Sequence, residues 1–529
     1  MSAPASTQET SSKEINSDFA TRKTELKQMT DTASNNKHSK KILYNTLAVY
    51  IKIIFNSIIT LIATRIVLDC LGVNDFGLYN LLAGVILLLS FMNGSLMIST
   101  QRYLSVAIGE GKKDKLVSIF NASMTIHLLL ALCVLSVLLL MQPILINEIL
   151  NIPDELKTTA HIVYDIMVVS SAITLLQVPY SAEMNAHQDI YYWAFTEAIN
   201  CFLRFLSAVA LFYIDSNKLE WYSILVLLSL IISALIKLVW CRKKYNETEL
   251  FLSEMKNKVL IKEMFGFVGW NTLGSSAVLV RNQGVAVILN MFFGTIVNAA
   301  YGIANQVNGL VMTLASTITT VFAPSIMQAH GAGDDEKMMK IATMSSKLSF
   351  FISSITAIPL IVYMQEILEL WLKEIPEYTV EFCTLMIMSF IILQLTAGVN
   401  RAIYAVGKIK NYQILITLVM YLIIPVGYLL LKLNFDIMSI FCVILIAQLV
   451  ILAIEIIYIK VLVPFNISNY VSFIIKSMVL FIIVVVAMEE ISVYSKLLNI
   501  FMGILYVVAY YYIIFNKEER NIIYQKIKK

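Results

Sequence analysis

Charged residues are scarce in this sequence. Asp, Glu, Lys and Arg make up 14% of its 529 residues, while hydrophobic residues make up 58%. Soluble domains average about 25% charged and about 45–50% apolar residues. A soluble chain could not hide this apolar excess, because its surface needs polar side chains. The composition therefore predicts a membrane protein.

Cysteine and histidine are also rare, with six and five residues. The cysteines form no CxxC pair and the histidines form no HExxH motif, so we expect neither a disulfide framework nor a bound metal. No GxSxG motif, phosphate-binding loop or GxGxxG loop occurs. Lys and Arg form no basic stripe interleaved with aromatic residues. We expect no catalytic site, no cofactor and no nucleic-acid partner.

Long hydrophobic runs, in contrast, fill the chain after residue 41. A spanning helix needs about 20 mostly apolar residues. The sequence predicts about fourteen spans, at residues 43–68, 77–99, 118–142, 160–184, 192–214, 220–241, 264–291, 296–321, 341–364, 379–403, 412–432, 437–460, 470–488 and 496–515. Residues 1–40 are polar and rich in Ser, Thr and Lys, and we expect this extension to be disordered.

Basic residues gather in every second loop between these spans. They include Lys112, Lys113, Lys115, Arg242, Lys243, Lys244, Lys337, Lys340, Lys408 and Lys410, and the tail after residue 515 is basic too. The intervening loops carry acids such as Glu148 and Glu374. This bias predicts that the basic loops and both termini are cytoplasmic. We expect a multi-pass protein of a bacterial inner membrane.

The chain also repeats itself at an offset of 222 residues. Leu71-Gly72 aligns with Phe293-Gly294, Tyr79 with Tyr301, and Gly109-Glu-Gly111 with Gly331-Ala-Gly333. The repeat predicts that spans 1–6 and 7–12 are two copies of one six-helix unit. Because six spans return the chain to the side from which it started, both copies have the same orientation in the membrane. The predicted parts are an N-terminal extension (1–40), an N-terminal lobe (41–241), a linker (242–262), a C-terminal lobe (263–460), two appended helices (461–515) and a basic tail (516–529).

This repeat, the segment Leu71-Gly-Val-Asn-Asp-Phe-Gly-Leu-Tyr-Asn80 and the later Gly109-Glu-Gly-Lys-Lys-Asp114 resemble the multidrug/oligosaccharidyl-lipid/polysaccharide (MOP) exporter superfamily. The resemblance covers about residues 42–515, and the first segment is similar to the opening of its polysaccharide-flippase (Wzx-like) branch. It implies an all-α, MATE-like fold whose two lobes line a V-shaped cavity that opens alternately to either side.

In that branch the cargo is an undecaprenyl-diphosphate-linked oligosaccharide. The resemblance therefore implies a flippase that moves this lipid to the periplasmic leaflet for O-antigen or capsule biosynthesis, with polysaccharide-assembly proteins as partners. Since the sequence has no nucleotide site, we expect an ion gradient, of H⁺ or Na⁺, or removal of the product to drive transport.

Polar residues inside the spans are the candidates for a cargo path, because a diphosphate and a glycan cannot cross hydrocarbon unpaired. Lys52 lies about 14 Å along its helix, near the midplane, and shares one face with Asn56 and Thr60. A charge there costs about 2.5–3.5 kcal/mol. The full candidate set is Lys52, Asn56, Thr60, Arg204, Asn271, Arg281, Tyr301, Asn305 and Asn308. Any one amide or hydroxyl equally suits helix packing.

Other intramembrane charges have two interpretations. Asp165 and Glu183 are candidates for binding a coupling ion. Five residues near helix ends are interpreted as interfacial anchors with heads that reach the membrane surface; they are Arg65, Lys237, Lys347, Glu455 and Lys476.

Two alternative functions remain open. A MATE-type cation-coupled multidrug antiporter has the same fold but needs buried carboxylates, whereas the first and seventh spans carry Lys52, Arg65 and Arg281 and no acid. A membrane glycosyltransferase or polymerase needs a large periplasmic loop, and the predicted loops are short. The sign of the buried charge favours an anionic cargo.

Overall fold

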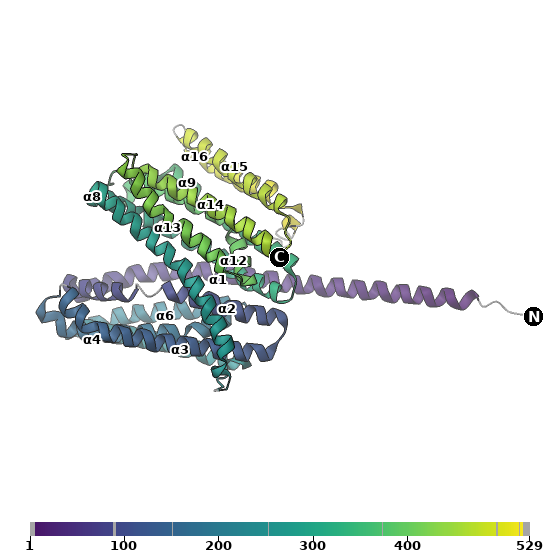
Figure 1. The fold of residues 1–529 in the computed structure, drawn as a ribbon, viewed down its shortest axis with the longest axis horizontal. Helices are drawn as coiled ribbons and strands as arrows, with labels where there is room; N and C mark the ends of the chain where they lie inside the picture. Colours follow the sequence, from purple (N-terminus) through teal and green to yellow (C-terminus); the bar gives the residue numbers. More distant parts are fainter. Residues whose placement is uncertain are drawn as a thin grey trace, which may run out of the picture.

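The computed structural model describes residues 6–87, 91–150, 152–251, 253–372, 374–492, 496–517 and 519–521, with side chains only from Lys41 onward. All regular structure in these ranges is helical, as the sequence predicts. Figure 1 shows two groups of helices that lie close together near the labelled C-terminus and diverge toward the opposite end. We call α1–α7 the N-lobe and α8–α14 the C-lobe; α15 packs on α9 beside the C-lobe.

The helices of the N-lobe are α1 (Ser6–Leu87), α2 (Phe91–Glu110), α3 (Lys113–Ile144), α4 (Asp154–Leu176), α5 (Val178–Ala186), α6 (Ile190–Ala210) and α7 (Lys218–Lys244). Those of the C-lobe are α8 (Lys258–Gly331), α9 (Asp335–Val362), α10 (Met364–Trp371), α11 (Thr379–Gln394), α12 (Ala397–Val406), α13 (Lys410–Lys432) and α14 (Met438–Leu462), followed by α15 (Ile467–Ser492) and α16 (Lys496–Ile514). Short turns are η1 (Leu145–Ile149), η2 (Leu211–Tyr213), η3 (Asn246–Thr248) and η4 (Glu254–Lys256).

Eleven helices of the described residues are long and apolar enough to cross a membrane, or twelve if α11 and α12, bent by 48°, form one span. The number is lower than the predicted fourteen for two reasons. α8 counts once although Gly294 breaks it, between the predicted spans at 264–291 and 296–321. The predicted span at 77–99 crosses residues 88–90, which lie outside the described ranges.

The backbone of α1 begins at Ser6, so it includes most of the extension that we expected to be disordered. Residues 6–40 contain neither Gly nor Pro. Once a helix is nucleated, each further residue adds one hydrogen bond at low cost. The apolar part of α1 therefore supports helix in a polar segment that has no core of its own.

The predicted repeat has the same backbone geometry in both copies. Gly72 and Gly294 interrupt α1 and α8 with φ of 74° and 80°, and Gly111 and Gly333 follow α2 and α8 with φ of 71° and 75°. Non-glycine residues rarely adopt these angles. The helix ends are closed by matching hydrogen bonds, Lys112 N–H to the Ala107 carbonyl and Asp334 N–H to the Ala329 carbonyl. All these positions differ by 222.

The lobes touch through the same repeat. A Cβ atom on Gly109 of α2 would lie 2.0 Å from the Gln328 carbonyl oxygen of α8, and one on Gly331 would lie 2.0 Å from the Val106 carbonyl oxygen. Gly109 and Gly331 are repeat partners, as are Val106 and Gln328. The two backbones therefore meet reciprocally, and only glycine permits this approach.

Side chains reinforce this contact from both sides. Arg102 of α2 donates to the carbonyl oxygens of Tyr404 (2.8 Å) and Val406 (3.3 Å) at the end of α12. Gln328 of α8 donates from Nε2 to the Ala186 carbonyl at the end of α5 (2.6 Å). Each lobe thus satisfies helix-terminal carbonyls of the other, groups that a helix leaves unpaired.

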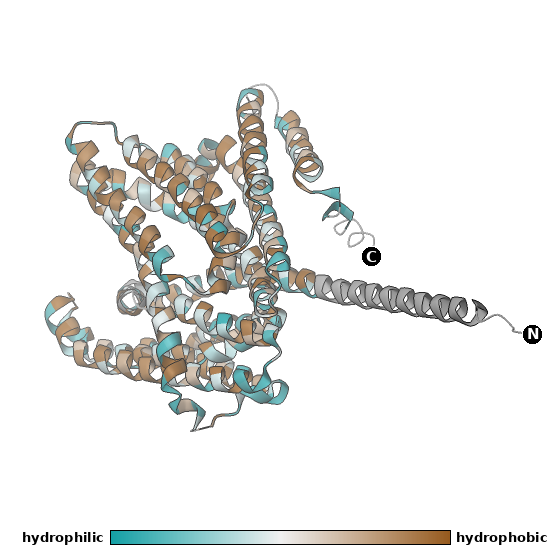
Figure 2. Ribbon diagram, turned by 45° about the vertical axis from the view of Figure 1, so that its right-hand side comes forward, coloured by the Kyte–Doolittle hydropathy of each residue, from teal (hydrophilic) through white to brown (hydrophobic). Residues whose placement is uncertain are grey.

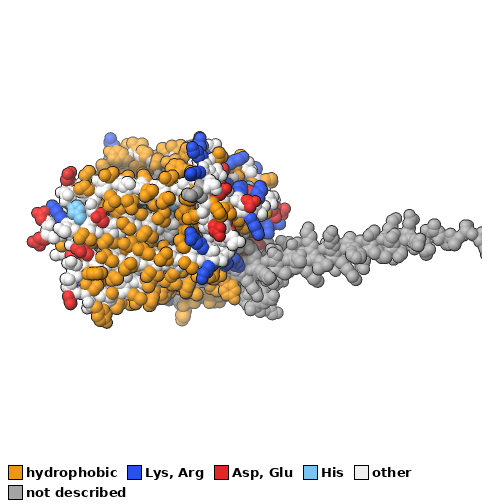
Figure 3. All heavy atoms as spheres, turned by 90° about the horizontal axis from the view of Figure 1, so that it is seen from below, with side chains coloured by type: hydrophobic (Ala, Val, Ile, Leu, Met, Phe, Trp, Pro, Cys, Tyr) orange, Lys and Arg blue, Asp and Glu red, His pale blue; other side chains and the backbone are white. Residues whose placement is uncertain are grey.

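The surface matches a protein that crosses a bilayer. Figure 2 shows helices that are hydrophobic along most of their length, with hydrophilic residues concentrated toward ends and loops. Figure 3 shows a broad hydrophobic belt between two charged ends, and many of the Lys and Arg side chains gather at one of these ends. This distribution agrees with the predicted placement of the basic loops on one side.

We predict that Gly109→Ala destabilises the protein, because the added methyl group must push the α2 and α8 backbones apart. Overpacking of this kind costs about 1–3 kcal/mol. Gly94→Ala in the same helix is the control, since nothing lies within 4 Å of the point where its added Cβ atom would stand, and it should leave the melting temperature in detergent unchanged or raise it. Equal melting temperatures for the two variants would contradict the close contact.

Candidate functional site

The polar stripe of α1 lies against α6. The Lys52 ammonium sits 4.3 Å from the ring centroid of Trp193. The Thr60 hydroxyl is 3.9 Å from Cys201 Sγ, which also contacts the Asn56 carbonyl. The predicted stripe therefore shares one face, and that face meets a neighbouring helix of its own lobe. Thr60 remains exposed, and Asn56 Oδ1 has no partner among the described residues.

Arg204 of α6 lines a cavity of about 300 Å³ inside the N-lobe. The polar residues around it are Tyr79, Asn93, Ser170, Ser171, Thr174 and Ser223, and the remainder of the wall is apolar. Arg204 is the charged residue of this wall and forms no ion pair within the described part of the chain. A fixed cation, hydroxyls and amides give this cavity the chemistry to bind an anionic polar group.

Glu197 lies on the same helix as Arg204 but pairs with a cation of α7. Its Oε1 lies 2.5 Å from Lys237 Nζ, which also donates to Gln177 Oε1 at 3.0 Å. Lys237 is 1% exposed, so its interpretation as an interfacial anchor was wrong. The interpretation rested on the distance of Lys237 from the end of its helix, and this distance does not show that the side chain points into the lobe.

Two other predicted anchors are buried as well. Lys347 pairs with Glu519 at 2.7 Å, which ties the segment after α16 to α9. Glu455 is 2% exposed and accepts hydrogen bonds from Asn400 (2.9 Å) and the Tyr412 hydroxyl (2.6 Å). Arg65 and Lys476 are exposed, in agreement with an anchoring role.

Glu455 is a functional candidate that sequence reasoning missed. Its second oxygen, Oε2, has no hydrogen-bond partner among the described residues. It lies beside the break between α11 and α12, where Thr396 and Asn400 add polar groups. The sequence does contain one sign of this role, because Glu455 is a single acid within an otherwise apolar span. An acid at such a position is costly unless it is buried with a partner.

In the C-lobe, the bend at Gly294 brings two candidates together. Arg281 precedes the bend, Tyr301 follows it, and the two side chains are within electrostatic range. Arg281 donates from Nε (3.1 Å) and Nη2 (2.8 Å) to Asn282 Oδ1, and no carboxylate of the described residues pairs with it. Asn305 donates to the Tyr301 carbonyl at 2.9 Å, and Asn308 Oδ1 is buried without a partner among the described residues.

Asn271 lies at the boundary between the lobes. It donates to the Ser95 carbonyl of α2 at 3.2 Å and accepts from the Tyr404 hydroxyl at 2.9 Å. Ser95 and Ser275 join α2 and α8 one turn away through their hydroxyl groups, 3.1 Å apart. These contacts give Asn271 a role in lobe packing.

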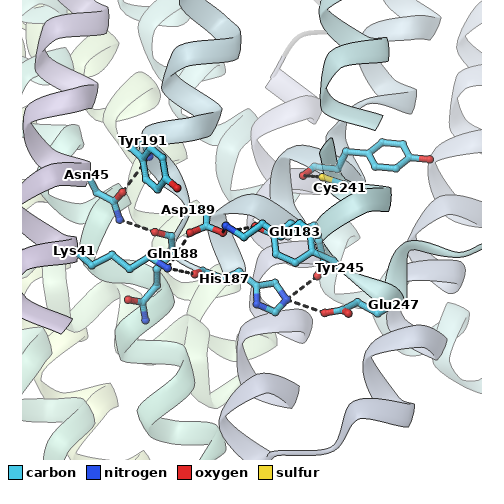
Figure 4. Close-up of polar contacts among 12 residues, drawn as sticks. Lys41, Asn45, Glu183, His187, Gln188, Asp189, Tyr191, Cys241, Tyr245 and Glu247 are labelled. Carbon is cyan, nitrogen blue, oxygen red and sulfur yellow. Dashed lines mark hydrogen bonds and ion pairs between the residues drawn. The ribbon is translucent and has the colours of Figure 1, made fainter. Parts of the chain in front are cut away.

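The two candidate ion-coupling acids lie apart in different surroundings. Asp165 is exposed and accepts a hydrogen bond from Gln142 at 2.7 Å. Glu183 is fully buried at the end of α5, beside His187 and Glu247 (Figure 4). Burial lowers the pKa of His187, but the adjacent carboxylates of Glu183 and Glu247 outweigh it and raise the pKa to about 9.

Removing the partner of Lys237 should destabilise the N-lobe. We predict that Glu197→Gln lowers the melting temperature in detergent, since breaking a buried pair costs about 3–5 kcal/mol, reduced here because Glu197 is 30% exposed. The double variant Glu197→Gln/Lys237→Met should recover most of the loss. Glu155→Gln, at an exposed acid, is the control. A Glu197→Gln protein as stable as this control would show that the pair contributes nothing.

No family model matches the chain. An uncharacterized membrane protein of Bacillus subtilis (strain 168), EpsK, is 24% identical over 299 residues, which make up 56% of this chain and 58% of that protein. The match thus spans little more than half of either protein.

Solved structures are similar over most of the chain. A MATE protein in the bent conformation has a TM-score of 0.70 at 14% identity, with 80% of this chain and 96% of that protein covered. An outward-facing multidrug resistance MATE transporter of the MOP superfamily has a TM-score of 0.69 at 13% identity, with 80% and 95% covered. A MOP superfamily transporter from Pyrococcus furiosus, described by the reversed polarity of its binding pocket, has a TM-score of 0.68 at 13% identity, with 80% and 95% covered. This chain therefore has the fold of the MATE transporters of the MOP superfamily.

Proposed function

We propose that this protein is a membrane transporter that moves an undecaprenyl-diphosphate-linked oligosaccharide from the cytoplasmic to the periplasmic leaflet by alternating access of its two lobes. The product would serve surface polysaccharide synthesis, as O-antigen or capsule. The proposal rests on the fold and on one observation above all. Each lobe holds an arginine, Arg204 or Arg281, that no carboxylate of the described residues neutralises.

An intramembrane cation without an anionic partner is costly, and a cargo diphosphate offsets that cost when it binds. A guanidinium forms two parallel hydrogen bonds to a phosphate group. The cavity beside Arg204 adds hydroxyl and amide groups of the kind that bind sugars. The structurally similar Pyrococcus furiosus transporter is described by the reversed polarity of its binding pocket. It is a precedent for proteins that share this fold but differ in the charge of the pocket.

A cation-coupled multidrug antiporter is the second candidate, and Glu455 favours it. This buried carboxylate has an oxygen in the C-lobe that no described residue binds, which is the kind of group that binds a proton or a cation. Both functions use the same two lobes. They differ in the sign of charge on the cargo, and a genetic test separates them.

We predict that deleting the gene in its host removes surface glycan, and that Arg204→Ala and Arg281→Ala fail to restore it at matched membrane expression. Each lost charge-assisted hydrogen bond should cost about 1.5–3 kcal/mol of cargo binding, a tenfold loss or more. Lys52→Ala should also impair transport, and Arg204→Lys should recover part of the activity because it keeps the charge.

Arg65→Ala and Lys476→Ala are the controls, since both remove an exposed cation that is not part of the Arg204 cavity wall, and both should restore the glycan. If the arginine variants restore glycan as well as these controls do, the cationic path is wrong. If deletion leaves the glycan intact but sensitises cells to cationic drugs, the antiporter replaces the flippase.

A further inference from the structure

One cluster of ionisable side chains lies outside the Arg204 cavity and away from Arg281, at the end of the N-lobe that touches the C-lobe. Glu183 comes from α5, His187 from the turn before α6, and Glu247 from η3 after α7 (Figure 4). The imidazole stacks on Tyr245, with ring centroids 4.4 Å apart and planes 14° from parallel. This stacking holds the ring with Nε2 between the two carboxylates.

The donor atoms converge on one point. His187 Nε2 lies 2.8 Å from Glu247 Oε1 and 3.0 Å from Glu183 Oε1, and the three ligand atoms all lie within 4.8 Å of one another. Nε2 carries at most one proton, and its hydrogen bond goes to Glu247.

Glu183 has no hydrogen-bond donor of its own. Its side chain is 0% exposed, its Oε1 lies 3.0 Å from His187 Nε2, whose hydrogen bond goes to Glu247, and its Oε2 receives no hydrogen bond from the described residues. A fully buried carboxylate in this condition carries a large desolvation cost. A ligand that binds both the Glu183 carboxylate and the His187 imidazole nitrogen would offset this desolvation cost.

The nearby cations are already engaged elsewhere. Lys41 and Lys244 pair with the two oxygens of Asp189 at 2.9 Å and 2.6 Å, and the Tyr245 hydroxyl also donates to Asp189. They balance Asp189 rather than Glu183, whose carboxylate contacts the His187 imidazole.

We propose that Glu183, His187 and Glu247 bind a divalent transition-metal ion of the Zn²⁺ class. One imidazole nitrogen and two carboxylate oxygens are a ligand set typical of such ions. Bonds of about 2.0–2.2 Å in tetrahedral geometry place ligand atoms about 3.3–3.6 Å apart, so the observed separations of 2.8 Å and 3.0 Å need to open by about 0.3–0.8 Å. The ion replaces the Nε2 proton, and two carboxylates match its charge.

The surroundings of the three residues show how an ion would reach the site and what it would hold in place. His187 and Glu247 side chains are 25% and 14% exposed, so an ion and a fourth ligand, water, enter from the loop side. Gln328 of the C-lobe bonds to the Ala186 carbonyl at 2.6 Å and to Gln188 Nε2 at 2.7 Å, on either side of His187. A bound ion therefore fixes the turn onto which the C-lobe docks. This inference does not depend on the cargo proposed above.

The test uses the full chain, purified without a histidine tag, stripped with a chelator, exposed to Zn²⁺ and gel-filtered before metal analysis. We expect about one Zn²⁺ per chain in the wild type and in Glu249→Gln, a control at an exposed acid two residues from Glu247. Glu183→Gln and His187→Gln should retain almost none. Zn²⁺ should raise the melting temperature of the wild type but of neither variant, and Co²⁺ should give the visible absorption of a tetrahedral site.

If a variant fails to fold, the chelator alone provides the test, since it should lower the wild-type melting temperature and Zn²⁺ should restore it. A stripped wild type that takes up no Zn²⁺, or a Glu183→Gln protein that takes up as much as the wild type, would overturn the proposal.

Discussion

The direct contact between the backbones of α2 and α8 is the constraint on which the arrangement of the two lobes depends. Lipid gives no hydrophobic drive for helices to associate, so close van der Waals approach and buried hydrogen bonds must supply it. Gly109 and Gly331 permit that approach, and Arg102 and Gln328 then reach helix-terminal carbonyls across the boundary. Because the contact lies at one end, the lobes are free to diverge at the other (Figure 1).

Four basic residues inside the spans form two pairs, and the difference between the pairs links stability to function. Lys237 and Lys347 are buried with carboxylate partners, so their cost is offset within the fold. Arg204 and Arg281 have no carboxylate partner among the described residues. The first pair holds helices together, whereas the second presents unneutralised charge, which is the physical basis of the anionic cargo that we propose.

Sequence reasoning located features that depend on spacing along the chain. The offset of 222 predicted two like units, and the paired glycines at 72 and 294 and at 111 and 333 have the same left-handed backbone. It also predicted that Lys52, Asn56 and Thr60 share a face, because four residues make about one helical turn. It erred at Lys237, Lys347 and Glu455, because distance from a helix end does not show which neighbour a side chain meets.

The sequence by itself determined the all-helical membrane class and the internal repeat, since both follow from apolar length and from periodicity within one chain segment. Only the tertiary structure decided that Glu197 pairs with Lys237 rather than with Arg204, and that Glu183, His187 and Glu247 meet at one point. Lys237 lies 40 residues from Glu197, and Glu247 lies 60 residues from His187. Their meeting depends on how helices rotate and pack against one another, which no local pattern encodes.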